Sequence, residues 1–257
     1  MFELPKGGAL TALASFTGAN GAFPADGLIA YAAGDLFGTA VGGGANDEGV
    51  VFELPKGGAL TVLASFTAEV GAPHGGLIAD AAGNLFGTIA GNGANTHGSV
   101  FEVLKEGSWY AFAPFFGPNG AQPVAGLIAY AAGNLFGTTL TGGANDDGVV
   151  FEVSKIDAFR FGAATVLDSF DGAHGSLPSA GLIADAAGKL FGTAGSGGAD
   201  SNGTIFEITG AGFAPSGVPE SATWVLMLAG FGLIGAASRR RRPAMPTSGA
   251  RGRFIHL

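Results

Sequence analysis

An internal repeat of about fifty residues constrains the fold of this chain more than any other feature. The phrase Gly-Leu-Ile-Ala occurs four times, beginning at Gly27, Gly76, Gly126 and Gly181. Each copy is followed 25 residues later by Phe-Glu, and the copies are 49, 50 and 55 residues apart. A fixed period of this length is typical of arrays in which each unit covers the hydrophobic face of its neighbour.

Each repeat is predicted to form four short strands. In the second repeat they are Gly76–Asp80, Leu85–Ile89, Ser99–Val103 and Trp109–Phe115, separated by segments rich in glycine, asparagine and proline. Short strands between such turns are typical of all-β proteins. The five extra residues of the last step fall around Lys155–Gly162, where a longer turn is expected because insertions collect in surface loops.

Four strands per fifty residues predict an all-β, β-propeller-like array of about four blades. Phenylalanine recurs in three positions of the repeat: Phe37, Phe86, Phe136 and Phe191; Phe52, Phe101, Phe151 and Phe206; and Phe16, Phe66, Phe115 and Phe170. Fully burying one ring contributes about 1.5–3 kcal/mol, so these rings are expected to form the core between blades.

The chain begins inside a repeat, in a third strand. Residues 1–17 match residues 51–67 at all but two positions, and Met1 stands where Val51 does. We therefore expect the natural start to lie further upstream, and an exported protein should begin with a signal peptide. Two arrangements are open: Leu10–Phe16 completes the last blade and closes a ring, or the chain is a fragment of a larger ring.

Charge and composition exclude several functions. Residues 1–217 carry 19 acidic and 6 basic side chains, whereas residues 218–257 carry one glutamate and six arginines. The acidic body should repel phosphate backbones, so no nucleic-acid partner is expected. The chain has no cysteine, which excludes disulfides and thiolate metal sites.

Candidate catalytic groups are few, and neither an enzymatic activity nor a cofactor is predicted. Weak candidates for Ca²⁺ ligands lie in the glycine-rich loops: Asp47, Asp146, Asp147 and Asp200. Calcium accepts such oxygen ligands, but Asn/Asp-Gly turns need no metal to explain them. One glutamate per repeat follows the second phenylalanine position, at Glu3, Glu53, Glu102, Glu152 and Glu207. These carboxylates either line a channel or, as we favour, face solvent or make a repeated hydrogen bond.

An apolar segment precedes a basic cluster near the C-terminus. Ala222–Ser238 contains 17 residues without charge, with Trp224 near its start, and it is followed by Arg239, Arg240, Arg241 and Arg242. This length is at the lower limit for a membrane-spanning helix, and arginines are typical of the cytoplasmic side. One C-terminal transmembrane helix in the inner membrane is therefore predicted.

This segment resembles the PEP-CTERM sorting signal of bacterial proteins processed by exosortase. Val218, Pro219 and Glu220 match the start of the motif, Ser221 stands where the signal has a second proline, and the apolar segment and basic cluster follow in order. The resemblance implies exosortase as a processing partner. It also implies export, transient residence in the inner membrane, and delivery to the cell surface or extracellular matrix.

The body is similar to the glycine- and valine-rich GloVer tandem repeats. The shared phrase is Gly-Leu-Ile-Ala-Asp-Ala-Ala-Gly-Asn-Leu-Phe-Gly-Thr, followed by Gly-Gly-Ala-Asn and Gly-Val-Val-Phe-Glu. The predicted organisation is a repeat domain over residues 1–210, a linker over 211–217, the sorting signal over 218–242 and a disordered tail over 243–257.

The sequence thus predicts a non-enzymatic, exported repeat protein with a structural or adhesive role at the cell surface or in an exopolysaccharide matrix. One alternative is a propeller enzyme that cleaves extracellular polysaccharide with a pair of carboxylates. Another is a polysaccharide-binding module that uses exposed aromatic side chains, with Trp109 and Tyr110 as candidates, although these more often pack on a blade.

Overall fold

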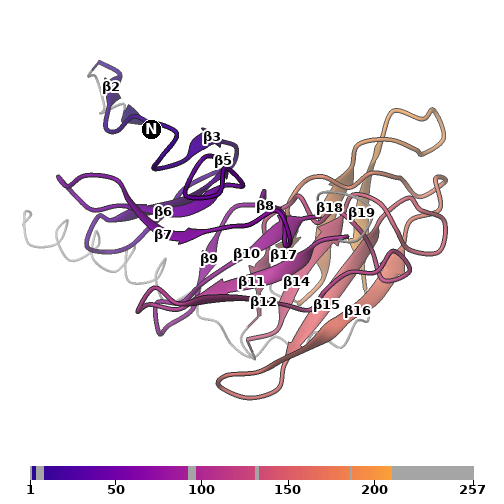
Figure 1. Cartoon of the computed structure of the whole chain (residues 1–257). Helices are drawn as coiled ribbons and strands as arrows, with labels where there is room; N and C mark the ends of the chain where they lie inside the picture. Colours follow the sequence, from indigo (N-terminus) through magenta and orange to yellow (C-terminus); the bar gives the residue numbers. More distant parts are fainter. Residues whose placement is uncertain (1, 4–8, 92–96, 131–132, 186, 210–257) are drawn as a thin grey trace, which may run out of the picture. The chain divides into compact units, whose positions relative to one another are not determined.

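The computed structural model describes residues 2–3, 9–91, 97–130, 133–185 and 187–209. These residues form antiparallel β-sheets and contain no helix, which confirms the all-β prediction (Figure 1). They belong to one compact unit, residues 1–216. No helix within the described ranges has the length and apolarity needed to cross a membrane. The helix predicted within Ala222–Ser238 lies outside these ranges.

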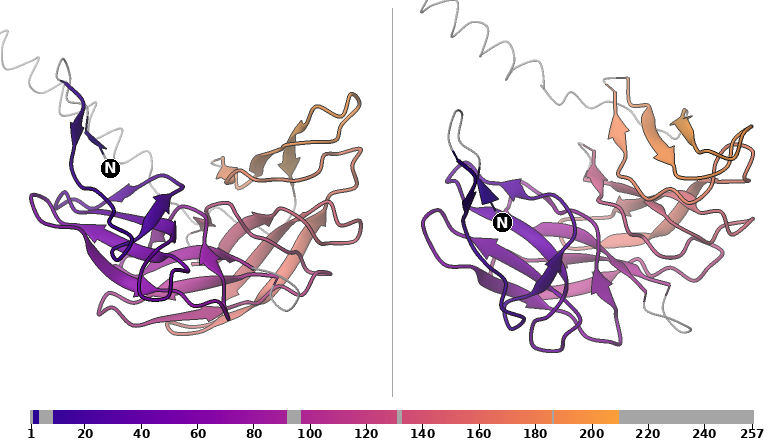
Figure 2. Two further views of the ribbon diagram at one scale, coloured as in Figure 1. Left: turned by 45° about the horizontal axis from the view of Figure 1, so that its top comes forward. Right: turned by 90° about the horizontal axis from the view of Figure 1, so that it is seen from above.

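Four sheets follow one another along the chain and are called blades below (Figure 2). Blade 1 contains β3 (Ala22–Pro24), β4 (Ile29–Ala30), β5 (Leu36–Gly42), β6 (Val50–Leu54) and β7 (Thr61–Ser65). Blade 2 contains β8 (Ala72–Pro73), β9 (Ile78–Ala79), β10 (Leu85–Ala90), β11 (Ser99–Val103) and β12 (Trp109–Phe112). Blade 3 contains β13 (Ile128–Ala129), β14 (Leu135–Thr139), β15 (Val149–Lys155) and β16 (Phe161–Ser169). Blade 4 contains β17 (Ile183–Ala184), β18 (Leu190–Ala194) and β19 (Thr204–Ile208).

The predicted strands are present, with differences at their ends. The second and third strands match closely, but the first strand of blade 2 is limited to Ile78–Ala79 and the fourth ends at Phe112. The fourth strand ends there because Ala113 takes a left-handed φ of 48° and is followed by Pro114, which has no N–H for the ladder. The short strands β3 and β8, which pair with the far ends of β5 and β10, were not predicted.

The insertion in the third repeat lengthens the two strands of a hairpin and not its turn, so the predicted longer turn is wrong: residues 156–160 separate β15 from β16, and the equally long 104–108 separate β11 from β12. β15 and β16 have 7 and 9 residues, against 5 and 4 in the equivalent β11 and β12. Ile156 N–H donates to the Arg160 carbonyl at 2.9 Å and closes the turn. The extension carries Phe161 onto blade 2, where its ring stacks on Phe112 with centroids 4.7 Å apart.

Phenylalanine rings join each blade to the next, as predicted. The third-position ring that ends one blade meets the second-position ring of the following blade edge to face. The pairs are Phe66–Phe101 at 5.1 Å, Phe115–Phe151 at 4.9 Å and Phe170–Phe206 at 5.0 Å. The repetition of this geometry shows that one junction is built three times. Such edge-to-face pairs contribute about 0.5–1.5 kcal/mol beyond the area they bury.

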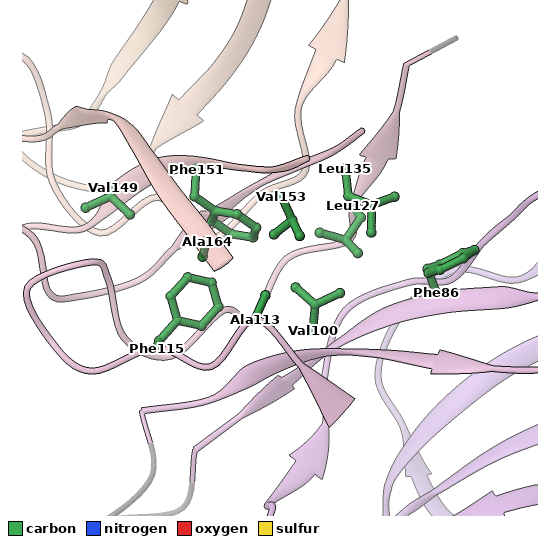
Figure 3. Close-up of a cluster of buried hydrophobic side chains, with 10 residues drawn as sticks. All are labelled: Phe86, Val100, Ala113, Phe115, Leu127, Leu135, Val149, Phe151, Val153 and Ala164. Atoms are coloured by element: carbon green, nitrogen blue, oxygen red, sulfur yellow. The ribbon is translucent and has the colours of Figure 1, made fainter. Parts of the chain in front are cut away.

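The apolar clusters have the same organisation. Between blades 2 and 3, Phe86, Val100 and Phe115 face Leu127, Leu135 and Phe151 (Figure 3). Both faces of β10 and β11 are buried, since every residue of the two strands is at most 9% exposed. Buried strands of this kind require neighbours on both sides, which the array supplies.

The glycine of Leu-Phe-Gly-Thr makes room for the second-position ring. Gly87 pairs with Phe101 across the sheet, and a Cβ added at Gly87 would lie 2.6 Å from Phe101 Cζ. The corresponding distance is 2.8 Å at both Gly38 and Gly137. The repeated glycine is therefore explained by packing against an aromatic ring.

The threonine of the same phrase links adjacent blades by a hydrogen bond. Thr39 Oγ1 donates to the Gly75 carbonyl at 3.3 Å, Thr88 Oγ1 to Ala125 at 3.0 Å and Thr138 Oγ1 to Ala180 at 3.3 Å. Each acceptor is the residue just before Gly-Leu-Ile-Ala of the next repeat. The three threonines are at most 2% exposed, so each bond satisfies a buried hydroxyl group.

The N-terminal segment does not complete the last blade. β2 (Thr11–Ala12) pairs with β1 (Phe2–Glu3), and β19 pairs with β18 alone among the described residues. The ring closure through Leu10–Phe16 considered from the sequence is therefore not the arrangement in this structure. Phe16 instead packs edge to face on Phe52 of blade 1, with ring centroids 5.0 Å apart. This pair has the same geometry as the ring pairs that join successive blades.

Candidate functional site

The loops that hold the calcium candidates are closed by their own hydrogen bonds. Asp47 Oδ1 accepts from Gly43 N–H at 3.1 Å, and Asp146 Oδ1 accepts from Gly142 N–H at 2.8 Å. Both aspartates have a left-handed φ, 61° and 63°, which this residue type tolerates. Turn chemistry accounts for their presence.

The other two calcium candidates, Asp147 and Asp200, lie in the equivalent loops of the third and fourth repeats. Asp147 contributes its backbone carbonyl to Leu177 N–H at 3.0 Å. Within the described part of the chain, no group of three or more histidine, aspartate or glutamate side chains is placed to hold a metal ion.

The repeated glutamates bind neighbouring polar side chains. Glu152 Oε1 accepts from Asn134 Nδ2 at 2.6 Å, and Glu207 Oε1 pairs with Lys189 Nζ at 2.5 Å. Asn134 and Lys189 occupy the same position of the repeat, just before Leu-Phe-Gly-Thr. Of the readings offered by the sequence, the repeated hydrogen bond is the one observed at these two glutamates.

Among Glu53, Glu102, Glu152 and Glu207, Glu102 is the most buried, with 4% of its surface exposed. It accepts a hydrogen bond from the Tyr110 hydroxyl on the adjacent strand β12. Burial raises the pKa of Glu102, the hydrogen bond from Tyr110 opposes this, and the charge of Asp80 adds to the rise. Burial and the same hydrogen bond raise the pKa of Tyr110 well above its usual range.

The two aromatic candidates for sugar binding are partly used in packing. The Trp109 indole lies on Phe66 of blade 1 with centroids 4.6 Å apart. Tyr110 is 37% exposed, but its hydroxyl is held by Glu102. Trp109 therefore belongs to the junction between blades 1 and 2, and Tyr110 lies beside Phe112 with ring centroids 5.9 Å apart.

A cavity with a mixed polar and apolar lining, which the sequence did not predict, lies between blades 1 and 2. Its volume is about 520 Å³, and its polar lining comes from Tyr31, Asp35, Glu53, Asp80 and Lys105. Tyr31 donates to the Gly83 carbonyl at 3.2 Å, and burial followed by the charges of Asp80 and Glu53 raises its pKa. Three carboxylates, a phenol and an ammonium group in one hollow suit a ligand rich in hydroxyl groups.

One sequence signal for this cavity existed. The residue after Gly-Leu-Ile-Ala alternates between tyrosine and aspartate along the four repeats, at Tyr31, Asp80, Tyr130 and Asp185. Tyr130 likewise donates to the Asp185 carbonyl of the next blade, at 3.5 Å. The alternation therefore marks junctions at which a phenol reaches the following turn.

The sorting-signal residues Val218, Pro219, Glu220 and Trp224, and the basic residues Arg239–Arg242, lie outside the described residues. The roles of these individual residues stay predictions. A family model for the PEP-CTERM protein-sorting motif matches residues 217–242. The chain therefore carries an exosortase-type sorting signal, which marks an exported protein with a transient membrane anchor at its C-terminal region.

The fold and its junctions define the class of the protein: an exported tandem-repeat protein made of propeller-type blades. The Gloeobacter/Verrucomicrobia repeat model matches residues 1–131 and 55–216. The chain belongs to the Gloeobacter/Verrucomicrobia repeat family.

Two solved structures are similar to this chain at low sequence identity. A gluconolactonase from Xanthomonas campestris is 18% identical with a TM-score of 0.50, over 77% of this chain and 65% of that one. A second protein assigned as a gluconolactonase is 18% identical with a TM-score of 0.46, over 71% of this chain and 63% of that one. The chain thus spans less than two thirds of either structure. No curated protein matches the chain in sequence.

Proposed function

We propose that this protein is a non-catalytic structural component of the cell surface or of an exopolysaccharide matrix, delivered there by exosortase. The observation that carries the proposal is the use of the repeated polar side chains. Thr39, Thr88 and Thr138 join blade to blade, and Glu152 and Glu207 are held by neighbours within their own sheets. Selection for a stable array explains why these side chains recur.

A second function, polysaccharide binding, is favoured by the cavity between blades 1 and 2. Its carboxylates can accept hydrogen bonds from sugar hydroxyl groups, and Lys105 and Tyr31 can donate them. Tyr110, 37% exposed on β12, offers an additional aromatic surface. This role is compatible with a structural one, because a matrix protein must hold the polymer around it.

The sorting part of the proposal is tested in the native organism, with and without its exosortase. With the enzyme, the protein should be found outside the cell without the residues beyond Pro219–Glu220. Without it, the intact chain should remain with the inner membrane. Replacing Arg239–Arg242 by alanine should prevent retention and processing, whereas replacing Arg251 and Arg253 should not. An intact tail in the surface form contradicts the proposal.

The choice between structure, binding and catalysis is tested with the same material. Affinity electrophoresis in gels that contain the organism's exopolysaccharide measures binding, and the double variant Asp35→Asn/Glu53→Gln should lose any retardation. Glu69→Gln, with its carboxylate outside the cavity, is the matched control. Shortening of the polysaccharide, or opening of an aldonolactone, that is lost with Asp35→Asn/Glu53→Gln supports an enzyme and overturns the non-catalytic proposal.

A further inference from the structure

Blade 1 carries an acid at a repeat position that holds a hydrogen-bond donor in the other three blades. The position just before Leu-Phe-Gly-Thr is asparagine in blades 2 and 3, lysine in blade 4 and aspartate, Asp35, in blade 1. In blade 3, Asn134 donates to Glu152 at 2.6 Å, and in blade 4, Lys189 donates to Glu207 at 2.5 Å. In blade 1 the equivalent side chain cannot donate when it is ionised.

The orientation of Asp35 brings its second oxygen to the position of that donor. Asp35 Oδ1 accepts from Lys56 N–H at 3.0 Å, as Asn134 Oδ1 accepts from Lys155 N–H at 2.9 Å. Asp35 therefore presents Oδ2 where Asn134 presents Nδ2, toward the repeated glutamate of its blade, Glu53. Within the described ranges, no side chain donates a hydrogen bond to the Glu53 carboxylate or forms an ion pair with it. These two acids lack the partner that the repeat supplies elsewhere.

Both acids line the cavity between blades 1 and 2, where negative charge is in excess. Asp80 adds a third carboxylate to the lining, and Lys105 adds one ammonium group. The Asp80 carboxylate already accepts hydrogen bonds from the N–H groups of Ala82 and Asn84, both at 2.9 Å. The two acids of blade 1 are thus the carboxylates left to bind a ligand, and a hollow lined mainly by one sign of charge attracts the opposite sign.

Blade 4 shows a group that satisfies the same position. The Lys189 ammonium group lies 2.5 Å from the Glu207 carboxylate. An ammonium group has three N–H donors on one nitrogen, so it can bind two carboxylates at once. A ligand with an ammonium group would therefore complete in blade 1 the contact that Lys189 completes in blade 4.

The apolar part of the cavity corresponds to a place where the next junction holds a ring. Phe37 and Leu63 line the cavity in blade 1. Their equivalents in blade 2 are Phe86 and Phe112. The ring of Phe161 packs against both equivalents, with centroids 5.5 Å and 4.7 Å away. Phe161 comes from the extended hairpin of blade 3, and the shorter hairpin of blade 2 has no such extension toward blade 1.

The remaining lining favours a sugar over a simple amine. The Tyr31 ring lies on Phe37 with centroids 4.7 Å apart and forms an aromatic wall, and Lys105 can donate to a hydroxyl group. The cavity volume of about 520 Å³ is in the range of small-molecule sites. An amino sugar combines a ring, hydroxyl groups and an ammonium group. A polyamine or a lysine side chain would leave Lys105 and the aromatic wall unused.

We propose that the cavity between blades 1 and 2 binds a sugar unit with a free amino group, as in a de-N-acetylated polysaccharide. The ammonium group binds between Asp35 and Glu53, and the sugar ring lies against Tyr31 and Leu63. Acetylation removes the positive charge and leaves both acids unpaired, so the N-acetylated sugar is disfavoured. This inference rests on the polysaccharide-binding function proposed above and deepens it by naming the class of sugar.

Calorimetric titration of the full-length protein with glucosamine tetramers and with N-acetylglucosamine tetramers tests the proposal. The glucosamine tetramer should bind at least tenfold more tightly. Asp35→Asn, which copies Asn134, and Asp35→Lys, which copies Lys189, should each weaken its binding at least tenfold, because the chain then supplies the donor to Glu53. Glu69→Gln, exposed and outside the cavity, is the control and should bind like the natural chain.

Unfolding in urea shows that these variants are folded. The midpoint should be higher for Asp35→Lys than for the natural chain, because the new ammonium group pairs with Glu53 as Lys189 pairs with Glu207. The proposal is overturned if the two tetramers bind equally, if Asp35→Asn keeps the preference for glucosamine, or if tetralysine binds more tightly than the glucosamine tetramer.

The outcomes separate this inference from the function on which it rests. Retardation by the organism's exopolysaccharide that depends on Asp35 and Glu53, together with equal binding of the two tetramers, overturns the amino-sugar assignment and supports polysaccharide binding. Selective binding of the glucosamine tetramer without any retardation supports the assignment and overturns the polysaccharide as the natural ligand.

Discussion

Replacing Gly87 by alanine should destabilise the protein by forcing a methyl group into a filled junction. The new Cβ would lie 2.6 Å from Phe101 Cζ, 2.7 Å from Phe101 Cε1 and 3.2 Å from Leu77 Cδ2. Phe101 is 0% exposed and Leu77 is 4% exposed, so neither can move into solvent. Overpacking of this kind costs about 1–3 kcal/mol.

Alanine substitutions at two other glycines provide comparisons for the stability change at Gly87. A Cβ added at Gly27 would have no heavy atom within 4 Å, and Gly27 does not have a left-handed φ, so Gly27→Ala should leave stability unchanged or raise it by about 0.4–1 kcal/mol. A Cβ added at Gly192 would lie 2.4 Å from Phe206 Cζ, but Phe206 is only half-buried in blade 4. Its ring can shift aside, so Gly192→Ala should cost less than Gly87→Ala despite the shorter distance.

Urea unfolding of the full-length chain, followed by circular dichroism and tryptophan fluorescence, measures these differences. The midpoint should fall for Gly87→Ala with an unchanged slope. The variant Phe101→Leu should relieve the strain, so that adding Gly87→Ala to it costs less than in the natural chain. If Gly87→Ala is no more destabilising than Gly27→Ala, the packing explanation of the repeated glycine is wrong.

Three further variants test individual contacts. Thr88→Val should lower the free energy of unfolding by about 1–3 kcal/mol, because it leaves the buried Ala125 carbonyl without a partner; the exposed Thr61→Val should change it little in the same urea titration. Phe161→Ala should cost about 1.5–2.5 kcal/mol, half of the cost for a fully buried ring, whereas Phe159→Ala, 85% exposed in the same hairpin, should be neutral. The raised pKa of Glu102 means that the folded state favours its protonated form, so this group stabilises the fold below its unfolded pKa of about 4.3 and loses that effect as pH rises through its folded pKa. Glu102→Gln should therefore gain stability relative to the natural chain between pH 4 and pH 7, and an equal gain for the exposed Glu106→Gln would contradict the role of burial.

The repeat phrases by themselves determined the β-strands and the core of this protein. Strand, turn and phenylalanine positions recur at fixed spacing along the sequence. The local sequence determines the strands and turns, and the stacking of successive repeats buries the rings. The sorting signal was equally readable, because Val218-Pro219-Glu220, the apolar segment and Arg239–Arg242 follow one another in a short stretch. Each of these features can be recognised without knowing what it contacts.

The tertiary structure decided which partner each recurring side chain takes. Thr88 bonds to Ala125, 37 residues away, and Tyr31 to Gly83, 52 residues away, and neither partner is marked by its residue type. The sequence favoured packing of Trp109 on a blade over sugar binding, but only the position of the indole beside blade 1 identified Phe66 as the ring that it contacts. Leu10–Ser15 and Leu60–Ser65 differ only by Ala12 in place of Val62, yet β2 covers Thr11–Ala12 whereas β7 covers Thr61–Ser65 along β6. Identical local preferences thus led to different structures, since hydrogen bonds and burial depend on what lies alongside.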